Sequence, residues 1–419
     1  MIEINTAQGN NYFYSVRSNR IYPMKMNEED CRNFHFVLDE SYSFNKISIY
    51  TIEITQQCNL RCKYCCYSGD YNNRRSHSTM QMSYKMLTSC VNFIGKTMNN
   101  EDSPITVCFY GGEALLAIDK ISWTINELQK HYPQTVFEYA ISTNGVLLNK
   151  KTVEWICSIP NLKVTVTVDG RREIHDSNRV VKDGKGSFEQ IMDNLQMFYQ
   201  LAPKEYLSRI QFISTVESIS QVIDLNDFWM NDTLLKQTRP KHISSIIPNF
   251  GKNERVMVNK ERFDYFYRSA FNAFIRGEEN VLTDELKRLV SVIERRLYYK
   301  EPQQQRFRTC FNNLYSCFIT ANGILYACER FCEELCIGSL YEGVDVGKCM
   351  HLNESFLQRK NKYCKNCWAH RMCRICATNL NNTEEQLCQY CENERMQLQL
   401  ALQYYCEMLE NKQINKRKL

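Results

Sequence analysis

The stretch Ile54-Thr55-Gln56-Gln57-Cys58-Asn59-Leu60-Arg61-Cys62-Lys63-Tyr64-Cys65 places three cysteines directly after a β-branched, strand-like run. The spacing CxxxCxxC lets one loop wrap around an iron–sulfur cluster with three thiolates, which leaves the fourth iron without a protein ligand. An open iron can bind a small molecule and pass it one electron, whereas a fully ligated cluster only relays electrons. For this segment alone zinc is the alternative, because Cys66 offers a fourth thiolate.

Length and composition limit the classes of protein that this chain can belong to. Its 419 residues are enough for about two to three domains. Hydrophobic residues make up 43% of the chain, which is typical of globular proteins, and no stretch approaches the roughly 20 apolar residues that a membrane span needs. The first residues do not form a signal peptide, so we expect a cytoplasmic protein with no membrane partner. The net charge of +5 is mild, and the basic run at 412–418 is interpreted as a solvated helix end rather than a nucleic-acid site.

The 21 cysteines are unevenly distributed along the chain. In the reducing cytosol they are expected to be metal ligands rather than disulfides. No cysteine lies between Cys157 and Cys310, whereas thirteen lie from Cys310 through Cys406. This change in composition predicts a domain boundary near residue 300.

Before that boundary, short β-branched runs alternate with segments of helical periodicity such as Met82–Met98 and Phe188–Gln200. The expected strands are Ile47–Thr55, Ile105–Tyr110, Val136–Ser142, Leu162–Val168, Arg209–Val216 and His242–Ile247. Six strand–helix units predict a parallel α/β fold with right-handed connections. Because six is fewer than the eight units of a closed barrel, we expect a partial (β/α)6 barrel of the TIM type.

Polar groups follow three successive strands of this predicted barrel. Gly111-Gly112-Glu113 follows the second strand, Ser142-Thr143-Asn144-Gly145 the third and Asp169-Gly170 the fourth. The glycines permit a close backbone approach, and the Glu113 carboxylate suits an ammonium group. One such residue is usually a helix cap, but three in succession at the carboxyl ends of strands indicate a ligand site.

These motifs together resemble the radical S-adenosylmethionine (SAM) superfamily over residues 47 to 248. The resemblance implies that Cys58, Cys62 and Cys65 hold a [4Fe-4S] cluster whose open iron binds SAM, and that SAM cleavage yields a 5'-deoxyadenosyl radical. It also implies a set of SAM-binding residues, with Tyr64 near the adenine: Tyr64, Gly111, Gly112, Glu113, Ser142, Asn144 and Asp169. No catalytic general base is identified.

The C-terminal cysteines resemble the SPASM extension, which binds two auxiliary [4Fe-4S] clusters, so three clusters are expected in all. The resemblance assigns one cluster to Cys310, Cys317, Cys328 and Cys376, and the other to Cys364, Cys367, Cys373 and Cys391. Cys388 is an alternative to Cys391, and the spacing between Cys373 and Cys376 is one residue shorter than in the family pattern. Cys332, Cys336 and Cys349 are interpreted as buried free thiols. A zinc ribbon is the alternative for the CxxC pairs.

The same resemblance defines four segments. They are a small N-terminal module at 1–46 with a hairpin at Tyr12–Val16 and Arg20–Pro23, a radical SAM core at 47–250, a helical linker at 251–305, and a SPASM domain with a C-terminal helix at 306–419. The N-terminal module is interpreted either as a docking site for a leader strand on the hairpin edge or as a capping hairpin.

The cysteine-rich end is most similar to maturases of ribosomally synthesised peptides, particularly those that join a Cys sulfur to a carbon. The expected activity is therefore of the oxidoreductase type, with a precursor peptide as substrate and a reductant such as flavodoxin or ferredoxin. An anaerobic sulfatase-maturating enzyme, which forms formylglycine, is the alternative enzyme. A metal-stabilised scaffold that binds a peptide is the alternative of another class.

Iron content tests the predicted set of clusters. Three [4Fe-4S] clusters amount to about twelve irons per chain after anaerobic reconstitution. Replacing Cys58, Cys62 and Cys65 together with Ala is expected to remove about a third of the iron and all SAM cleavage. Stoichiometric zinc, with no iron lost in the triple variant, would contradict the assignment.

Overall fold

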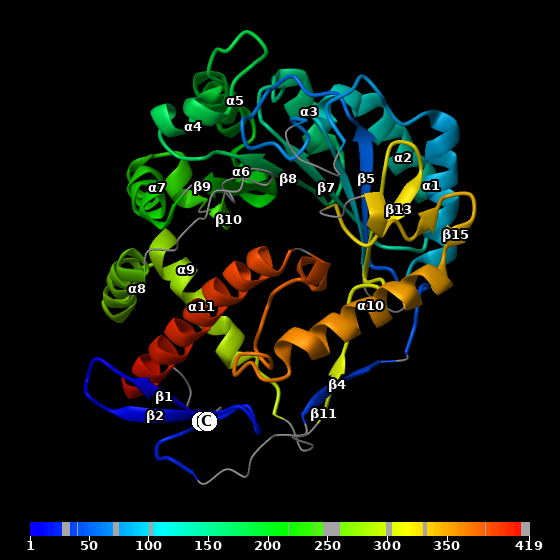
Figure 1. The fold of residues 1–419 in the computed structure, drawn as a ribbon. Helices are drawn as coiled ribbons and strands as arrows, with labels where there is room; N and C mark the ends of the chain where they lie inside the picture. The colour runs from blue at the N-terminus through cyan, green and yellow to red at the C-terminus, as the bar shows by residue number, and fades with distance from the viewer. Residues whose placement is uncertain are drawn as a thin grey trace. The chain divides into compact units, whose positions relative to one another are not determined.

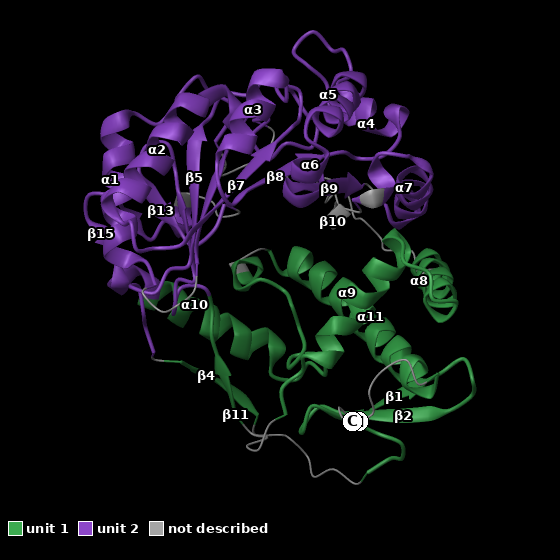
Figure 2. Ribbon diagram, turned by 180° about the vertical axis from the view of Figure 1, so that it is seen from behind, with its two compact units in different colours: residues 1–40, 257–309, 350–419 green, residues 41–256, 310–349 purple. Residues whose placement is uncertain are grey.

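The computed structural model describes residues 1–26, 34–39, 41–69, 75–99, 104–216, 218–238, 240–245, 260–298, 304–329, 333–381 and 383–411. The chain forms two compact units, neither of which is continuous in sequence (Figure 2). Unit 1 comprises Met1–Glu40, Met257–Thr309 and Met350–Leu419. Unit 2 comprises Ser41–Val256 and Cys310–Cys349. Among the helices of the described residues, none combines the length and the apolar character needed to cross a membrane.

Unit 2 is built on a parallel sheet with the strand order β10-β9-β8-β7-β6-β5 (Figure 1). These strands are β5 (Ile49–Thr55), β6 (Ile105–Gly111), β7 (Phe137–Thr143), β8 (Leu162–Thr167), β9 (Ile210–Val216) and β10 (Pro240–Ser245). All six expected strands are present and parallel, which confirms the α/β fold class and the six-stranded partial barrel. The last two residues of the sixth expected strand, 246 and 247, lie outside the described residues.

Helices follow the strands in the order that the periodicity predicts. They are α1 (Tyr84–Thr97), α2 (Ile118–His131), α3 (Lys150–Ser158), α4 (Arg172–Asn178), α5 (Phe188–Leu201), α6 (Pro203–Arg209) and α7 (Ile219–Asn231), with 3₁₀ turns η1 (Ala114–Ala117) and η2 (Leu235–Gln237). Side-chain caps fix several starts: the Ser83 side chain accepts from Met86 N, and the Asn149 side chain accepts from Thr152 N. Such caps typically stabilise a helix by about 1 kcal/mol.

Along the strands, buried and partly exposed side chains alternate, which distinguishes a helix-covered face of the sheet from an inner face. On β6, Ile105, Val107 and Phe109 are fully buried, whereas the residues between them remain partly exposed. Side chains two residues apart lie on the same face of a strand. The apolar set therefore forms the core beneath the helices, and the inner face is left for polar residues.

The first part of the cysteine-rich segment continues the sheet of unit 2. Strand β12 (Ser316–Ile319) pairs in parallel with β5, and β13 (Ile324–Tyr326), β14 (Gly338–Ser339) and β15 (Gly343–Val344) follow it antiparallel; a 3₁₀ turn η3 (Glu333–Leu335) precedes β14. The buried Glu53 carboxylate accepts from Ala321 N at 3.0 Å and pairs with Arg75. The pairing of β12 with β5 covers an edge of β5 that would otherwise expose unpaired backbone groups.

The described residues of unit 1 form two small sheets and four long helices. Its strands are β1 (Ile2–Asn5), β2 (Asn11–Ser15) and β3 (Arg20–Tyr22) in one antiparallel sheet, and β4 (His35–Leu38) parallel to β11 (Gln304–Phe307). Its helices are α8 (Lys260–Ile275), α9 (Val281–Glu294), most of α10 (Val346–Cys364) and α11 (Glu384–Glu410), with the turn η4 (Ala377–Asn381). The expected hairpin is confirmed as β2 and β3, and Asn19 takes the left-handed conformation at its turn, with φ 59°. Strand β1 was not predicted.

A core substitution tests this description of the sheet. Phe109→Ala is expected to lower the free energy of unfolding by about 3 to 5 kcal/mol, because it leaves a cavity between β6 and the helices. Val136→Ala removes a side chain that is 63% exposed and serves as the control, with an expected change within about 0.5 kcal/mol. Anaerobic denaturant unfolding measures both, and equal losses would contradict the assignment of the two faces.

Candidate active site

The three-cysteine loop is held by backbone contacts on both sides. Leu60 N donates to Cys58 Sγ, and Tyr67 N donates to Cys65 Sγ, each at 3.4 Å. The loop is fixed to the segment after α4 because Arg61 N donates to Val180 O at 2.7 Å. Amide donors aimed at sulfur stabilise thiolates, so the loop is prepared for metal-bound sulfur.

Burial acts on all three thiols of the loop, which are half-buried. It raises the pKa of Cys58 to about 11 and also raises the pKa of Cys62. The pKa of Cys65 is raised by a hydrogen bond with Cys66 and by burial. Iron binding would replace these protons, since the thiolate is the ligand. Within the described parts of the chain, no three His, Cys, Asp or Glu side chains converge on a point as the ligands of one metal ion do.

The two glycines after β6 allow its backbone to lie against this loop. Gly111 has φ +140°, and a Cβ there would lie 1.9 Å from Thr55 O. A Cβ on Gly112 would lie 2.2 Å from Gln57 O. Gly112 N donates to Thr55 O, and Glu113 N donates to Gln57 O, both at 2.8 Å. Only glycine fits at these two positions, which lock the second motif against the first.

Glu113 joins the second motif to the third. Its carboxylate is 1% exposed and accepts from Thr143 Oγ1 at 2.7 Å, Asn144 N at 2.8 Å and Leu115 N at 3.1 Å. Burial raises the pKa of Glu113, and these donors oppose that shift. In this structure the carboxylate therefore positions the turn at Asn144, and a direct contact with an ammonium stays a prediction.

The third motif reaches back to the cluster loop. Asn144 Nδ2 donates to Asn59 Oδ1 at 2.7 Å. Ser142 is exposed on the inner face of the sheet, where it pairs in register with Thr165. The predicted residues after β6 and β7 are thus gathered at the carboxyl ends of the strands, beside the three cysteines.

Tyr64, Asp169 and Arg179 form a group beside Cys62, in which Tyr64 is half-buried and the other two residues are buried. Tyr64 OH donates to Asp169 Oδ2 at 2.6 Å and accepts from Arg179 Nη1 at 2.7 Å. Thr215 N donates to Asp169 Oδ1 at 2.8 Å. Burial raises the pKa of Asp169, and Arg179 opposes this shift. Tyr64 therefore links the cluster loop to the end of β8.

Sequence reasoning missed Arg179. Its guanidinium is 5% exposed, and its Nε has no hydrogen-bond partner among the described residues. Arg179 opposes the effect of burial on the pKa of Cys62, which places its positive charge near that thiol. No helix is predicted at this position from the sequence, and a basic residue just after a short helix such as α4 would usually be interpreted as a helix cap.

His175 supports this group from α4. Its Nδ1 accepts from Asp169 N at 3.3 Å, and its Nε2 lies 3.1 Å from Ser187 Oγ. The ring is fully buried, and burial lowers the pKa of His175 to about 3. The imidazole is therefore neutral, and it holds the backbone of Asp169 in place.

In unit 1 the cysteines assigned to one auxiliary cluster are near enough to Cys391 to interact with it electrostatically, and their role as ligands of one cluster stays a prediction. Burial and the neighbouring Cys364, Cys373 and Cys367 raise the pKa of Cys391 to about 11. Arg374 N donates to Glu394 Oε1 at 2.8 Å, and this hydrogen bond ties the segment between Cys373 and Cys376 to α11. Cys388 lies one turn before Cys391 on the same helix and is exposed.

The four cysteines assigned to the other auxiliary cluster come from both units. Cys310 is exposed, Cys328 is half-buried, and Cys376, which is exposed, belongs to unit 1. Cys317 is 1% exposed on β12 and lies in register with Tyr50, on the helix-covered face. The assignment of these four cysteines to one cluster stays a prediction.

The expectation of buried free thiols has mixed outcomes. Cys349 is fully buried, as expected. For Cys336 the expectation is wrong: this thiol is half-buried, and Lys348 Nζ donates to its Sγ at 2.9 Å. It lies on the short connection between η3 and β14. Cys332 lies outside the described residues.

Comparisons with known proteins agree with this site. Residues 52–210 match the model of the radical SAM superfamily. A cysteine-type anaerobic sulfatase-maturating enzyme of Clostridium novyi is 27% identical over 338 residues, which cover 76% of this chain and 84% of that relative. The same kind of enzyme in Clostridium perfringens is 21% identical, over 84% of this chain and 90% of the relative.

Two solved structures share the fold. Native anSMEcpe with bound AdoMet superposes with a TM-score of 0.63 at 17% identity, over 87% of this chain and 99% of that chain. Streptococcus suis SuiB bound to the precursor peptide SuiA superposes with a TM-score of 0.51 at 14% identity, over 82% of this chain and 74% of that one.

Residues 52–210 form a radical SAM domain, so the chain contains the catalytic domain of this enzyme superfamily. Membership of this superfamily implies a [4Fe-4S] cluster and SAM as cofactors. The expected family and fold class are confirmed.

The buried His175 makes stability depend on pH. In the unfolded chain its pKa is about 6.5, so between pH 6.5 and about 3 only the unfolded state binds the proton. Stability is therefore expected to fall as the pH drops through this range, by about 2 to 3 kcal/mol at pH 4.5. Denaturant unfolding at several pH values should show a smaller slope in His175→Gln. His131→Gln changes a half-exposed ring and should keep the wild-type dependence of the unfolding free energy on pH. Equal pH dependence in all three proteins would contradict the role assigned to the buried His175.

Proposed function

We propose that this protein is a radical SAM maturase that modifies a peptide or protein substrate by hydrogen abstraction. The observation that carries the proposal is the contact of the three-cysteine loop with the Gly111–Gly112 turn, which brings the cluster ligands and the predicted SAM residues together. Sulfatase-maturating enzymes of two Clostridium species are among its sequence relatives, and they align over 76% and 84% of this chain. A metal-stabilised scaffold would have no need for this arrangement.

The residues of the loop fit a cluster. Cys58, Cys62 and Cys65 would hold it, and Cys62 interacts electrostatically with both of the others. When bound, the cluster supplies the electron that cleaves SAM to a 5'-deoxyadenosyl radical. The protein's part is to hold SAM and to keep water away from the site.

Among the residues near the loop, Arg179 is the one best suited to the SAM carboxylate. It is a buried cation with a free Nε, and Tyr64 OH holds its Nη1. Ser142 and Asn144 lie at the same end of the sheet and would meet the ribose and carboxylate groups. Glu113 and the two glycines would shape the place for the amino group, and Tyr64 would border the adenine.

A volume-matched substitution tests the role of Arg179. Arg179→Met removes the cation and is expected to weaken SAM binding by roughly tenfold to a hundredfold, the value of one charge-assisted hydrogen bond. Calorimetry on the reconstituted enzyme measures the affinity, and the iron content should stay unchanged. Arg172→Met, on the exposed side of α4, is the control. Equal SAM affinities in the two variants would contradict the role of Arg179 in SAM binding.

We further propose that the enzyme carries three [4Fe-4S] clusters in all. The grouping of Cys364, Cys367, Cys373 and Cys391 supports one auxiliary cluster, and Lys360 and Arg395 lie near enough to Cys364 to offset its negative charge. Such clusters would take up the electron that remains after hydrogen abstraction. A flavodoxin or ferredoxin would reduce the first cluster.

Two products are consistent with this chemistry. The cysteine-rich end, with Cys364-Lys365-Asn366-Cys367-Trp368 at its centre, resembles maturases that form thioether bonds in precursor peptides, and this is our first proposal. The second candidate is formylglycine formation, which the sulfatase-maturating relatives favour. Both reactions begin with abstraction of a hydrogen from the peptide.

Mass spectrometry distinguishes the two products. The reduced enzyme is incubated with SAM and either a Cys-bearing precursor peptide from a neighbouring reading frame or a sulfatase-type peptide with one Cys. A thioether product is lighter by two hydrogens per bond and no longer reacts with iodoacetamide. An aldehyde on the sulfatase peptide, with the precursor unchanged, would replace the first proposal by the second, and SAM cleavage with neither peptide changed would contradict both.

A further inference from the structure

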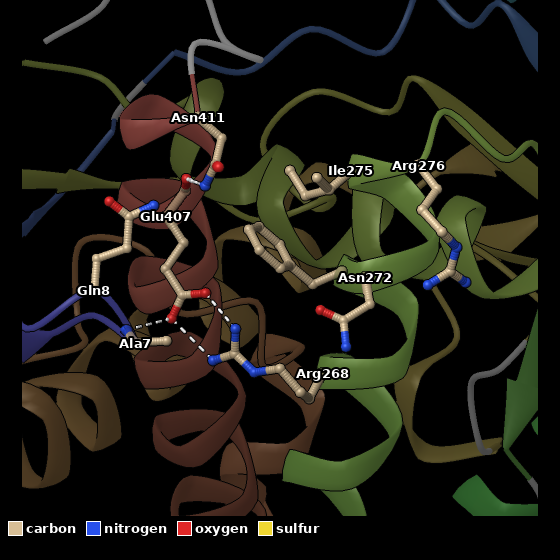
Figure 3. A pocket seen from close by; sticks show the side chains of 9 residues that line it. Ala7, Gln8, Arg268, Asn272, Ile275, Arg276, Glu407 and Asn411 are labelled. Carbon is tan, nitrogen blue, oxygen red and sulfur yellow. Dashed lines mark hydrogen bonds and ion pairs between the residues drawn. The ribbon is translucent and has the colours of Figure 1, made fainter.

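Unit 1 contains a pocket of about 350 Å³ that the proposed chemistry does not use. It lies where the β1–β2 turn, α8 and the end of α11 meet (Figure 3). In Figure 3 Gln8 lies beside α11, Asn272 projects from α8, and Arg276 follows the last residue of α8. All of its lining residues belong to unit 1.

On one wall of the pocket, the charges of Arg268 and Glu407 offset each other, and hydrogen bonds hold both side chains in place. Glu407 is 1% exposed and accepts from both terminal nitrogens of Arg268 and, at 3.1 Å, from Ala7 N. The Arg268 guanidinium also stacks over the Tyr404 ring, 4.9 Å from its centroid. The carboxylate of this bidentate pair is buried, whereas the Arg268 side chain is 34% exposed, and the paired hydrogen bonds fix the geometry of both side chains. This wall therefore ties the β1–β2 turn to α8 and α11 and gives the pocket a constant shape.

The other walls offer unused polar groups beside an apolar floor. The carboxamides of Gln8 and Asn272 have no hydrogen-bond partner in the parts of the chain that are described. Arg276 pairs with Glu278, but the two side chains are 61% and 41% exposed, and pairs this exposed contribute little. Ile275, which is 37% exposed, and the buried Phe271 form the floor.

We propose that this pocket binds a segment of the peptide substrate, remote from the residue that is modified, in which an acidic side chain lies next to an aliphatic one. A carboxamide carries a donor and an acceptor, which match the N–H and C=O of a peptide backbone. Arg276 suits the carboxylate, and the floor formed by Ile275 and Phe271 suits the aliphatic side chain. The inference rests on the proposed peptide substrate.

Fluorescence anisotropy of the reconstituted enzyme tests this pocket with a defined probe. The probe is a fluorescein-labelled nonapeptide, Gly-Ser-Leu-Glu-Leu-Glu-Gly-Ser-Gly, and its partner has Gln in place of both Glu. We expect the acidic peptide to bind roughly tenfold more tightly than the Gln peptide. Arg276→Glu should abolish this preference, and Asn272→Ala should weaken both peptides severalfold. Arg262→Glu makes the same charge change on an exposed turn of α8 outside the pocket, and it should bind as the wild type does.

Any of three other results would contradict the proposal that the pocket binds a segment of the substrate. These results are no binding of the acidic peptide at millimolar concentration, equal binding of the two peptides, or equal losses in Arg276→Glu and Arg262→Glu. SAM cleavage by the wild-type enzyme without peptide is measured in parallel. Its absence would contradict the proposed function and leave the binding result as evidence about the pocket alone.

Discussion

The site depends on the contact between two backbones, the end of β6 at Gly111–Gly112 and the loop that follows β5. Cβ atoms at these glycines would lie 1.9 and 2.2 Å from carbonyl oxygens of the loop, so no larger residue leaves the contact intact. The hydrogen bonds from Gly112 N and Glu113 N make the loop an extension of the sheet. Because parallel strands end together at one edge, this single contact also sets where the later motifs meet the cysteines.

Buried charges around the loop form a preorganised environment. Asp169 and Arg179 would be costly to bury alone, but Tyr64 OH lies between them and hydrogen-bonds to both. Glu113 is likewise satisfied by three donors. Arg179 Nε is buried and has no hydrogen-bond partner within the described parts of the chain, so a carboxylate bound there would gain a hydrogen bond.

The cysteine-rich end of the chain is divided between the two units. Its first part pairs with β5 and is fixed by Glu53, so it shares the rigidity of the sheet. Its second part forms the Cys364–Cys391 group, held by the contact of Arg374 with Glu394. The same unit carries the pocket at α8, which would allow one unit to combine electron transfer with recognition of the substrate.

The sequence by itself determined the features that are local: the cysteine spacing, the six strands, the glycines and the residues that follow each strand. These follow from short-range periodicity and from motifs whose members are adjacent in the chain. Tertiary structure alone decided the role of Arg179, which meets Tyr64 across 115 residues, and the addition of β12 to β5. It also decided the direction of Cys317, since one residue of register determines whether a side chain lies beneath the helices or on the inner face of the sheet. Such outcomes depend on pairing between distant segments, and no local pattern encodes which segments pair.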